Sequence, residues 1–418
     1  MKVLAIGAAG KMGRAVVSYF ANDPELETLG LLDTQESVLL SLTRGDQSGR
    51  FKIHPLDIGR IDEVKEVMKG YDVGVVTLPN RKLSYQVLEA AIEARLDLVD
   101  ILEEYHRRPD TYQTEGFVIP PEFKDSAEYG EALHEKALQN DVLILDGMGF
   151  APGLSNITTA HGISLLDQAD KAVARVGGIP NIDCCAKHPL RYMTTWSLEH
   201  VLREYSIKTL ILKDGKYTEV HALHDEESFQ FDECGVHEKL ECAVTPGMPS
   251  FIYTHSALQY FAEKTVRWPG HYQGVRTLIE CGLFDEKPVE CEGVRLSPRK
   301  VLLSIINPLL IPQEGEGDVC IMYNTVTGRK DNIPHQVEYF MWERPDQEFS
   351  AMARVTSFPA AIGAKMIALG KTDLKGVRAP EECILGESYH WFLDELQDKN
   401  ITIKEKVSPV GEKEPLPA

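Results

Sequence analysis

Several classes of protein are excluded by what this 418-residue sequence lacks. Its 44 Lys and Arg are outnumbered by 64 Asp and Glu. The net charge of −20 argues against binding to nucleic acid or to an anionic membrane, because both require clustered Lys and Arg. No apolar run approaches the roughly 18 residues that a membrane-spanning helix requires. The chain begins directly with the strand-like MKVLAIG, without the basic and apolar segments of a secretory signal, so we expect a cytoplasmic protein.

Cysteine is also sparse, with eight residues in the whole chain. Cys184 and Cys185 are adjacent, and no C-x-x-C pair occurs, so the spacing does not indicate a tetrahedral zinc site. Thiols of a cytoplasmic protein stay reduced. We therefore expect neither a bound metal nor disulfide bonds.

What the sequence does contain is a regular alternation of short apolar strands and amphipathic helices. Strands are predicted at residues 2–8, 28–33, 71–79, 97–101 and 141–147. Helices are predicted at 11–22, 61–69, 84–95 and 128–140. Such alternation indicates parallel strands joined by crossover helices.

After residue 150 the pattern becomes a mixture of short strands, loops and helices. The segment KDGK at 213–216 is typical of a tight hairpin between two β-rich runs. Further helices are predicted at 357–370 and 388–400, and the polar, Pro-rich end VSPVGEKEPLPA is expected to be frayed. Because the chain exceeds the size of a single hydrophobic core, we predict two domains, or one domain with a large insertion.

The first predicted turn reads G-A-A-G-K-M-G and lies between a strand and a helix. Glycines there let the backbone approach a pyrophosphate, while the helix N-terminus offers free N–H groups. Asp33 ends the next strand 20 residues after Gly13, where a carboxylate accepts hydrogen bonds from the adenine ribose and repels a 2′-phosphate. NAD is therefore favoured and NADP is the alternative; the turn could also belong to another nucleotide-binding or structural domain. The predicted cofactor residues here are Gly7, Ala9, Gly10, Lys11, Met12, Gly13 and Asp33.

Residues that follow the other strands are the next candidates, because ligands of such sheets bind beyond the carboxyl ends of the strands. Leu78, Pro79, Asn80 and Asp100 are predicted to contact the cofactor. For Asp100, a solvated strand-end carboxylate or a helix cap is the alternative interpretation.

Five segments further along the chain carry a resemblance to a known family. They read DGMGFAPGLSNI, RVGGIP, HPLRYMTTWSLEHVLREY, TVRWPGH and ARVTSFPAAI, in this order. Together they resemble the saccharopine dehydrogenase-like family, in the branch that contains lysine 6-dehydrogenase. The glycine turn is one residue longer than is common in that family, and the segment 105–123 is longer than in its compact members, which leaves the substrate open.

The resemblance implies an α/β fold and a homodimer. Residues 1–150 and 351–400 would form a discontinuous Rossmann dinucleotide-binding domain. A mixed α+β substrate and dimerisation domain would be inserted at residues 151–350, and 401–418 would be a flexible tail.

The resemblance also implies the residues of a substrate site, which would face the cleft between the domains. Arg267 and Arg191 would bind carboxylates, because a guanidinium forks onto a carboxylate. Trp268, Tyr192 and Phe150 would contact the substrate. His271 would be the base, with Asp100 or Glu104 as further candidates. The alternatives are that Arg267 and Trp268 form a packed core pair beside a turn, and that Arg191 is a solvated surface residue.

The function implied is an NAD(P)-dependent amine dehydrogenase of a small amino acid, with L-lysine 6-dehydrogenase as the first candidate. Such an enzyme oxidises the side-chain amine to an imine by hydride transfer, after the nitrogen has lost a proton. A saccharopine or carboxynorspermidine-type dehydrogenase of a secondary amine is the second candidate, which Arg107 and Arg108 leave open as further anchors. A non-catalytic dinucleotide-binding scaffold is the third.

Overall fold

The computed structural model describes residues 1–44, 46, 48–109 and 117–410. The chain forms two compact units. The first unit comprises Met1–His161, Met248–His255 and Ala353–Thr402. The second comprises Gly162–Gly247, Ser256–Met352 and Ile403–Ala418. The short segment Met248–His255 therefore belongs to the first unit, although the sequence predicted that all of residues 151–350 would form the second domain.

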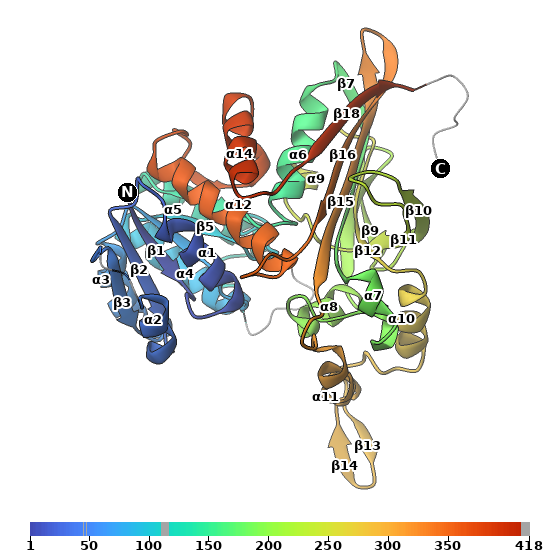
Figure 1. Ribbon diagram of the computed structural model, residues 1–418, viewed down its shortest axis with the longest axis horizontal. Coiled ribbons are helices and arrows are strands. Elements are labelled where there is room, and N and C mark those ends of the chain that lie inside the picture. Colours follow the sequence, from blue (N-terminus) through green and yellow to red (C-terminus); the bar gives the residue numbers. More distant parts are fainter. Residues whose placement is uncertain (45, 47, 110–116, 411–418) are drawn as a thin grey trace. The chain divides into compact units, whose positions relative to one another are not determined.

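The first unit is built on a parallel sheet in the strand order β17-β6-β5-β4-β1-β2-β3. Its strands are β1 (Lys2–Ile6), β2 (Thr28–Asp33), β3 (Phe51–Pro55), β4 (Val73–Val76), β5 (Asp97–Asp100), β6 (Leu143–Asp146) and β17 (Gly376–Arg378). The predicted parallel strands are confirmed, and Figure 1 shows β1, β2 and β3 side by side in blue. The strand order reverses between β1 and β4, which is where such sheets bind a dinucleotide.

The helices that lie wholly or mostly in this unit are α1 (Lys11–Ala21), α2 (Glu36–Leu42), α3 (Ile61–Met68), α4 (Arg81–Ala94), α5 (Ser126–Gln139), α6 (Leu154–Ser164), α9 (Phe251–Thr254), α12 (Ala351–Ala368), α13 (Pro380–Cys383) and α14 (Glu387–Asp398). Apolar residues of the strands, such as Leu4 and Val76, pack against Leu88 and Ile92 of α4 in one buried cluster. This packing fixes the carboxyl ends of the strands, and with them the loops that follow.

The second unit is built on a mixed sheet in the order β10-β11-β12-β7-β15-β16-β18, with β8 pairing β12 and β9 pairing β8. Its strands are β7 (Gln168–Pro180), β8 (Lys208–Lys213), β9 (Lys216–His221), β10 (Glu227–Phe231), β11 (Glu238–Val244), β12 (Tyr260–Arg267), β15 (Asp318–Lys330), β16 (Ile333–Glu343) and β18 (Lys404–Pro409). The predicted KDGK hairpin is confirmed, because Lys213 pairs Lys216 and both central residues have positive φ, 52° at Asp214 and 68° at Gly215.

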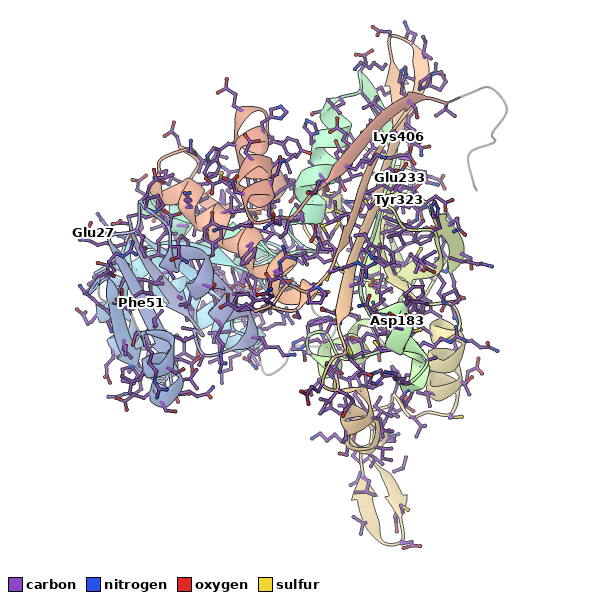
Figure 2. The ribbon with its side chains drawn as sticks, viewed as in Figure 1. Glu27, Phe51, Asp183, Glu233, Tyr323 and Lys406 are labelled. Carbon is purple, nitrogen blue, oxygen red and sulfur yellow. The ribbon has the colours of Figure 1, made fainter. Side chains whose placement is uncertain are left out.

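The remaining elements of the second unit are α7 (Ile182–Cys185), η1 (Pro189–Arg191), α8 (Leu198–Glu204), α10 (His271–Glu280), the hairpin β13 (Val289–Cys291) and β14 (Val294–Leu296), and α11 (Pro298–Leu310). Aromatic side chains pack on the long strands of the sheet. Tyr323 of β15, labelled in Figure 2, stacks on Phe340 with 4.9 Å between the ring centroids, and its ring lies 5.2 Å from the Arg175 guanidinium.

The prediction of a flexible tail from residue 401 is wrong for Lys404–Pro409, which form β18. This strand pairs antiparallel with the outer side of β16 over His335–Phe340, and Figure 1 shows the two running together. An edge strand needs only backbone groups on one side, so it tolerates the polar residues and the terminal proline that suggested a frayed end. Residues 411–418 lie outside the described part of the chain.

Within the described residues, no group of three or more His, Cys, Asp and Glu side chains is arranged to hold a metal ion. The eight cysteines all lie in the described part of the chain, and none of them forms a disulfide bond. In the same part of the chain, no helix is both long enough and apolar enough to cross a membrane.

Candidate active site

The glycine turn lies at the carboxyl end of β1 and is held there by backbone hydrogen bonds. The N–H groups of Gly7 and Ala8 both donate to the carbonyl of Leu32, and the Thr77 hydroxyl donates to the carbonyl of Gly7 at 3.1 Å. Gly7 has a φ of 84°, and a Cβ on Gly13 would lie 2.1 Å from the Gly7 carbonyl oxygen. Both positions therefore require glycine, and the absence of a Cβ at Gly13 lets the start of α1 pack closely against the turn.

Helix α1 begins from this turn with an open N-terminus. Its N-cap residue is Gly10, which makes no side-chain hydrogen bond to the helix. Ala9 is buried, Lys11 is exposed, and the carbonyl of Met12 accepts a hydrogen bond from Ser357 at 3.0 Å. The first-turn N–H groups and the positive end of the helix dipole suit a phosphate.

Asp33 ends β2 beside the glycine turn, as the sequence predicted. One carboxylate oxygen accepts a hydrogen bond from the N–H of Ala9 at 3.1 Å, and the other accepts one from Gln35 at 3.1 Å. A carboxylate has lone pairs for further donors, such as ribose hydroxyls. The turn, the helix end and this carboxylate are the features that a dinucleotide requires.

The segment after β4 also lies at this edge. A Cβ on Gly7 would come within 3.3 Å of the Leu78 side chain, so Leu78 borders the glycine turn. Asn80 is the N-cap of α4, where its side-chain oxygen accepts a hydrogen bond from Leu83 at 3.1 Å. Leu78 and Pro79 therefore lie in the loop next to the switch point of the sheet, while the side chain of Asn80 caps the N-terminus of α4.

A buried hydrogen-bonded network lies at the carboxyl ends of β5 and β6. His106 Nδ1 lies 2.6 Å from Asp146, and His106 Nε2 lies 2.9 Å from the Ser84 hydroxyl, which donates to Asp100 at 2.5 Å. Asp100 also accepts from the N–H of Leu102 at 2.6 Å. The sequence predicted Asp100, but it offered no motif for Ser84 or His106.

Glu104 is part of an adjacent ion pair. Both of its carboxylate oxygens face Arg81 of α4, at 2.5 Å and 2.9 Å, and the hydroxyl of Tyr85 donates to it at 3.2 Å. Arg81 and Glu104 are each 2% exposed. Because its charge is matched by this pair, Glu104 is a poorer candidate for the base than Asp100.

Arg107 and Arg108, which the sequence offered as further anchors for a secondary-amine substrate, form ion pairs within the protein. Arg107 donates to Glu131 of α5 at 2.8 Å and 3.0 Å, and Arg108 pairs with the same carboxylate. They are therefore not a second cluster of unpaired anchors. Residues 110–116 of the long segment 105–123 lie outside the described residues.

In the second unit, Arg267 ends β12 and its guanidinium is enclosed by aromatic rings. Its Nε donates to the hydroxyl of Tyr205 at 2.8 Å, and its Cζ lies 5.0 Å from the ring centroid of Tyr192. Nη1 donates to the carbonyl of Val266 at 2.9 Å. No residue in the described ranges accepts a hydrogen bond from Nη2 or places a carboxylate within ion-pair distance of this guanidinium.

His271 begins α10 and belongs to the same network. Its Nδ1 faces the carbonyl of Leu190 at 2.9 Å, which only accepts, so Nδ1 carries the proton and Nε2 accepts from the Tyr205 hydroxyl at 3.1 Å. Burial, followed by the charge of Arg267, lowers the pKa of His271 to about 3. Both nitrogens are engaged and the ring is neutral, so the geometry suits a residue that positions Tyr205 and Arg267, and it does not favour His271 as the base.

Three other predicted substrate residues lie in different surroundings. The indole N–H of Trp268 donates to the carbonyl of Pro180 at 2.8 Å, and its rings pack among Ile179, Val266 and Phe231, which matches the core interpretation of this residue. Arg191 is exposed. Phe150 is buried in the first unit.

Comparison with known proteins identifies the family. Residues 3–143 match the saccharopine dehydrogenase NADP binding domain, and residues 149–401 match the saccharopine dehydrogenase C-terminal domain. The chain belongs to the saccharopine dehydrogenase family.

Two similar proteins align with nearly the whole length of this member of the saccharopine dehydrogenase family. A carboxyaminopropylagmatine dehydrogenase from Synechocystis sp. is 22% identical over 403 residues, which cover 91% of this chain and 92% of the relative. Apo saccharopine dehydrogenase (L-Glu forming) from Saccharomyces cerevisiae has the same fold, with a TM-score of 0.75 and 18% identity, over 97% of this chain and 99% of that structure.

Family membership makes this protein an NAD(P)-dependent oxidoreductase that acts on amine donors. The residues fit the cofactor, since the turn carries Gly7, Gly10 and Gly13, the N-terminus of α1 has no side-chain cap, and Asp33 lies beside them. When bound, NAD(P) accepts a hydride at the nicotinamide ring. The protein supplies binding, orientation and a place for the proton.

Proposed function

We propose that this dehydrogenase oxidises the amine of a substrate that carries one carboxylate held by Arg267, with the side-chain amine of L-lysine as the first candidate. The observation that supports the proposal is the state of Arg267. Its guanidinium is buried, at 3% exposure, and no carboxylate of the described residues lies within ion-pair distance of it, although the charge of Glu204 contributes to its raised pKa.

A buried cation with no carboxylate in direct contact is costly, so a ligand carboxylate that pairs with it would be stabilising. Tyr205 and Tyr192 hold the guanidinium, and His271 fixes the Tyr205 hydroxyl. Nη2 is left to donate to a carboxylate, which a planar guanidinium binds with defined geometry. One such arginine suits an amino acid with a single carboxylate.

The other arginines that the sequence suggested as anchors are consistent with the same choice. Arg107 and Arg108 are paired with Glu131, and Arg191 is exposed. The resemblance of the RWPGH and HPLRY segments to lysine 6-dehydrogenase supports L-lysine as well. An ammonium must lose a proton before its carbon can release a hydride, and Asp100 is our candidate for the group that accepts it.

A secondary amine is the second candidate, and one finding favours it. The relative that spans 91% of this chain is named a carboxyaminopropylagmatine dehydrogenase. Its name combines a carboxyl group with an extended polyamine, so a long secondary amine with one carboxylate would also suit Arg267.

The experiment is to follow the absorbance of reduced nicotinamide with purified protein, NAD or NADP, and a panel of lysine, ornithine, saccharopine and carboxynorspermidine. Turnover of lysine with NAD supports the first candidate. Turnover confined to saccharopine or carboxynorspermidine replaces it with the second. The family resemblance also leads us to propose a homodimer, which light scattering during size-exclusion chromatography tests.

A further inference from the structure

The network around His106 lies on the half of the sheet that would face the nicotinamide. Asp100 and Asp146 are register partners and end β5 and β6. A dinucleotide lies across the switch point, with its adenine ribose beside Asp33 on one half of the sheet. The nicotinamide half therefore belongs to the edge of β4, β5 and β6, where this network is found.

The hydrogen bonds of the network allow two arrangements with the same heavy-atom positions. A serine hydroxyl has one proton to donate. If Ser84 donates to Asp100, at 2.5 Å, then His106 Nε2 must donate to Ser84, at 2.9 Å, and the ring is an imidazolium. If Asp100 is protonated, it donates to Ser84, which donates to Nε2 of a neutral ring. The two arrangements differ only by a shift of protons along the line Asp100–Ser84–His106.

Asp146 holds the imidazole in place for either arrangement. One of its oxygens lies 2.6 Å from Nδ1, and the other accepts the backbone N–H of His106 at 2.7 Å. Ser84 and His106 are 0% exposed, and Asp100 and Asp146 are 1% exposed. The hydrogen-bonded line is therefore shielded from bulk water.

Several charged or titratable groups lie around His106. The charged groups are Asp146 of β6, Asp100 of β5 and the Arg81–Glu104 ion pair. The ring of Tyr85 on α4, which carries a titratable hydroxyl, contacts the imidazole. Burial alone would lower the pKa of His106, but the carboxylates of Asp146, Asp100 and Glu104 outweigh it and raise the pKa to about 9. Burial also raises the pKa of Asp100.

We propose that Asp100, Ser84, His106 and Asp146 form a proton relay for the amine dehydrogenase reaction, in which Asp100 exchanges a proton with the substrate nitrogen and His106 stores it. Ser84, His106 and Asp146 are positioning residues that act through Asp100. The proposal deepens the proposed function in that it takes Asp100 as the proton acceptor, but it does not depend on which amine is the substrate.

In the oxidative direction the relay starts with one proton fewer than these two arrangements, with Asp100 ionised and His106 neutral. The N–H bond of the substrate ammonium breaks and an O–H bond forms on Asp100. Asp100 passes a proton to Ser84, which passes its own to Nε2 of a neutral His106, so the relay ends as a carboxylate and an imidazolium. The substrate carbon then loses a hydride with its electron pair, and the amine is oxidised to an iminium as the nicotinamide is reduced. Oxidation therefore requires neutral His106, and imine reduction requires the imidazolium.

The experiment compares Ser84→Ala with Ser250→Ala in the full-length protein. Ser250 is a matched control, because its buried hydroxyl donates to the buried carboxylate of Glu381 at 2.8 Å in the same unit, outside the relay. In the wild type and in Ser250→Ala, kcat for amine oxidation is expected to rise with pH through about 9. Ser84→Ala is expected to lose this inflection and to fall about 100-fold in kcat, with its KM for the cofactor unchanged. An unaltered pH profile in Ser84→Ala, with only a lower Tm, would overturn the relay.

A second measurement needs no substrate, and a His106→Gln variant identifies which of the 13 histidine signals belongs to His106. The ring nitrogens of His106 in ¹⁵N-histidine-labelled protein are expected to change protonation state near pH 9. A ring that keeps one state from about pH 6 to pH 10 would overturn the proposal. Because this measurement uses the ligand-free protein, it separates failure of the relay from failure of the proposed substrate.

Discussion

The carboxylate of Asp33 accepts a hydrogen bond from the backbone N–H of Ala9 at 3.1 Å, which joins the end of β2 to the glycine turn. The contact fixes a negative charge beside the place where the adenine ribose would lie. This relationship links the choice of cofactor to one side chain.

Replacing this charge tests the predicted preference for NAD over NADP. In Asp33→Asn the amide oxygen can still accept one of the two backbone hydrogen bonds, but the charge that repels a 2′-phosphate is lost. We expect KM for NAD to rise about tenfold and the preference over NADP to fall by a similar factor. Steady-state kinetics with both cofactors checks this. Asp57→Asn is the control, since Asp57 is an exposed carboxylate that accepts a backbone N–H from Gly59 after β3. The same change in both variants would contradict the assignment.

The glycine turn makes a steric prediction. In Gly13→Ala the new Cβ would lie 2.1 Å from the carbonyl oxygen of Gly7, so the turn must open. We expect Tm to fall and the affinity for NAD(P)H, measured by fluorescence titration, to drop at least tenfold. Gly70→Ala, whose Cβ would lie 3.4 Å from the carbonyl oxygen of Val67, is expected to keep wild-type affinity. Wild-type affinity in Gly13→Ala would show that the cofactor does not use this turn.

His271 gives a prediction for stability against pH. Its pKa is lowered from 6.5 to about 3 in the folded protein, so between these values the unfolded chain binds the extra proton. The contribution of His271 to the free energy of unfolding is therefore fully present above about pH 6.5 and is lost as pH falls toward 3.

In His271→Gln this part of the pH dependence should disappear. Urea unfolding at about pH 7 and about pH 4.5 gives the free energy of unfolding of the wild type and of the variant. Subtracting one from the other at each pH cancels the titration of all other groups. The gap between the two proteins is expected to narrow at the lower pH. A gap of constant size would mean that His271 is not held neutral.

The sequence predicted those parts of the fold and site that local physics dictates. Gly7 and Gly13 are required by backbone conformation and steric contact, so the turn is visible in the sequence itself. The parallel strands follow from alternating apolar runs and helices. Strand β18 was missed because an edge strand is stabilised by backbone pairing to β16, which its composition does not reveal.

The network around His106 could not be predicted because its members meet only in the folded sheet. Ser84 and Asp100 are 16 residues apart, and His106 and Asp146 are 40 residues apart. The roles within TVRWPGH were equally hidden. Arg267, Trp268 and His271 are close in sequence, but Trp268 packs into the apolar interior while His271 supports Arg267 through Tyr205.

Arg267 is proposed to bind the carboxylate of the substrate, and one comparison tests this role most directly. Oxidation of lysine and of 1,5-diaminopentane, the same chain without the carboxylate, is measured in the wild type, in Arg267→Lys and in Arg175→Lys. Arg175 is the control, because it is an arginine of the same unit that is already paired with Glu227 at 2.8 Å. We predict that Arg267→Lys lowers kcat/KM for lysine at least tenfold and leaves 1,5-diaminopentane unchanged, while Arg175→Lys does not change the ratio between the two substrates. Equal losses for both substrates in Arg267→Lys would contradict the account.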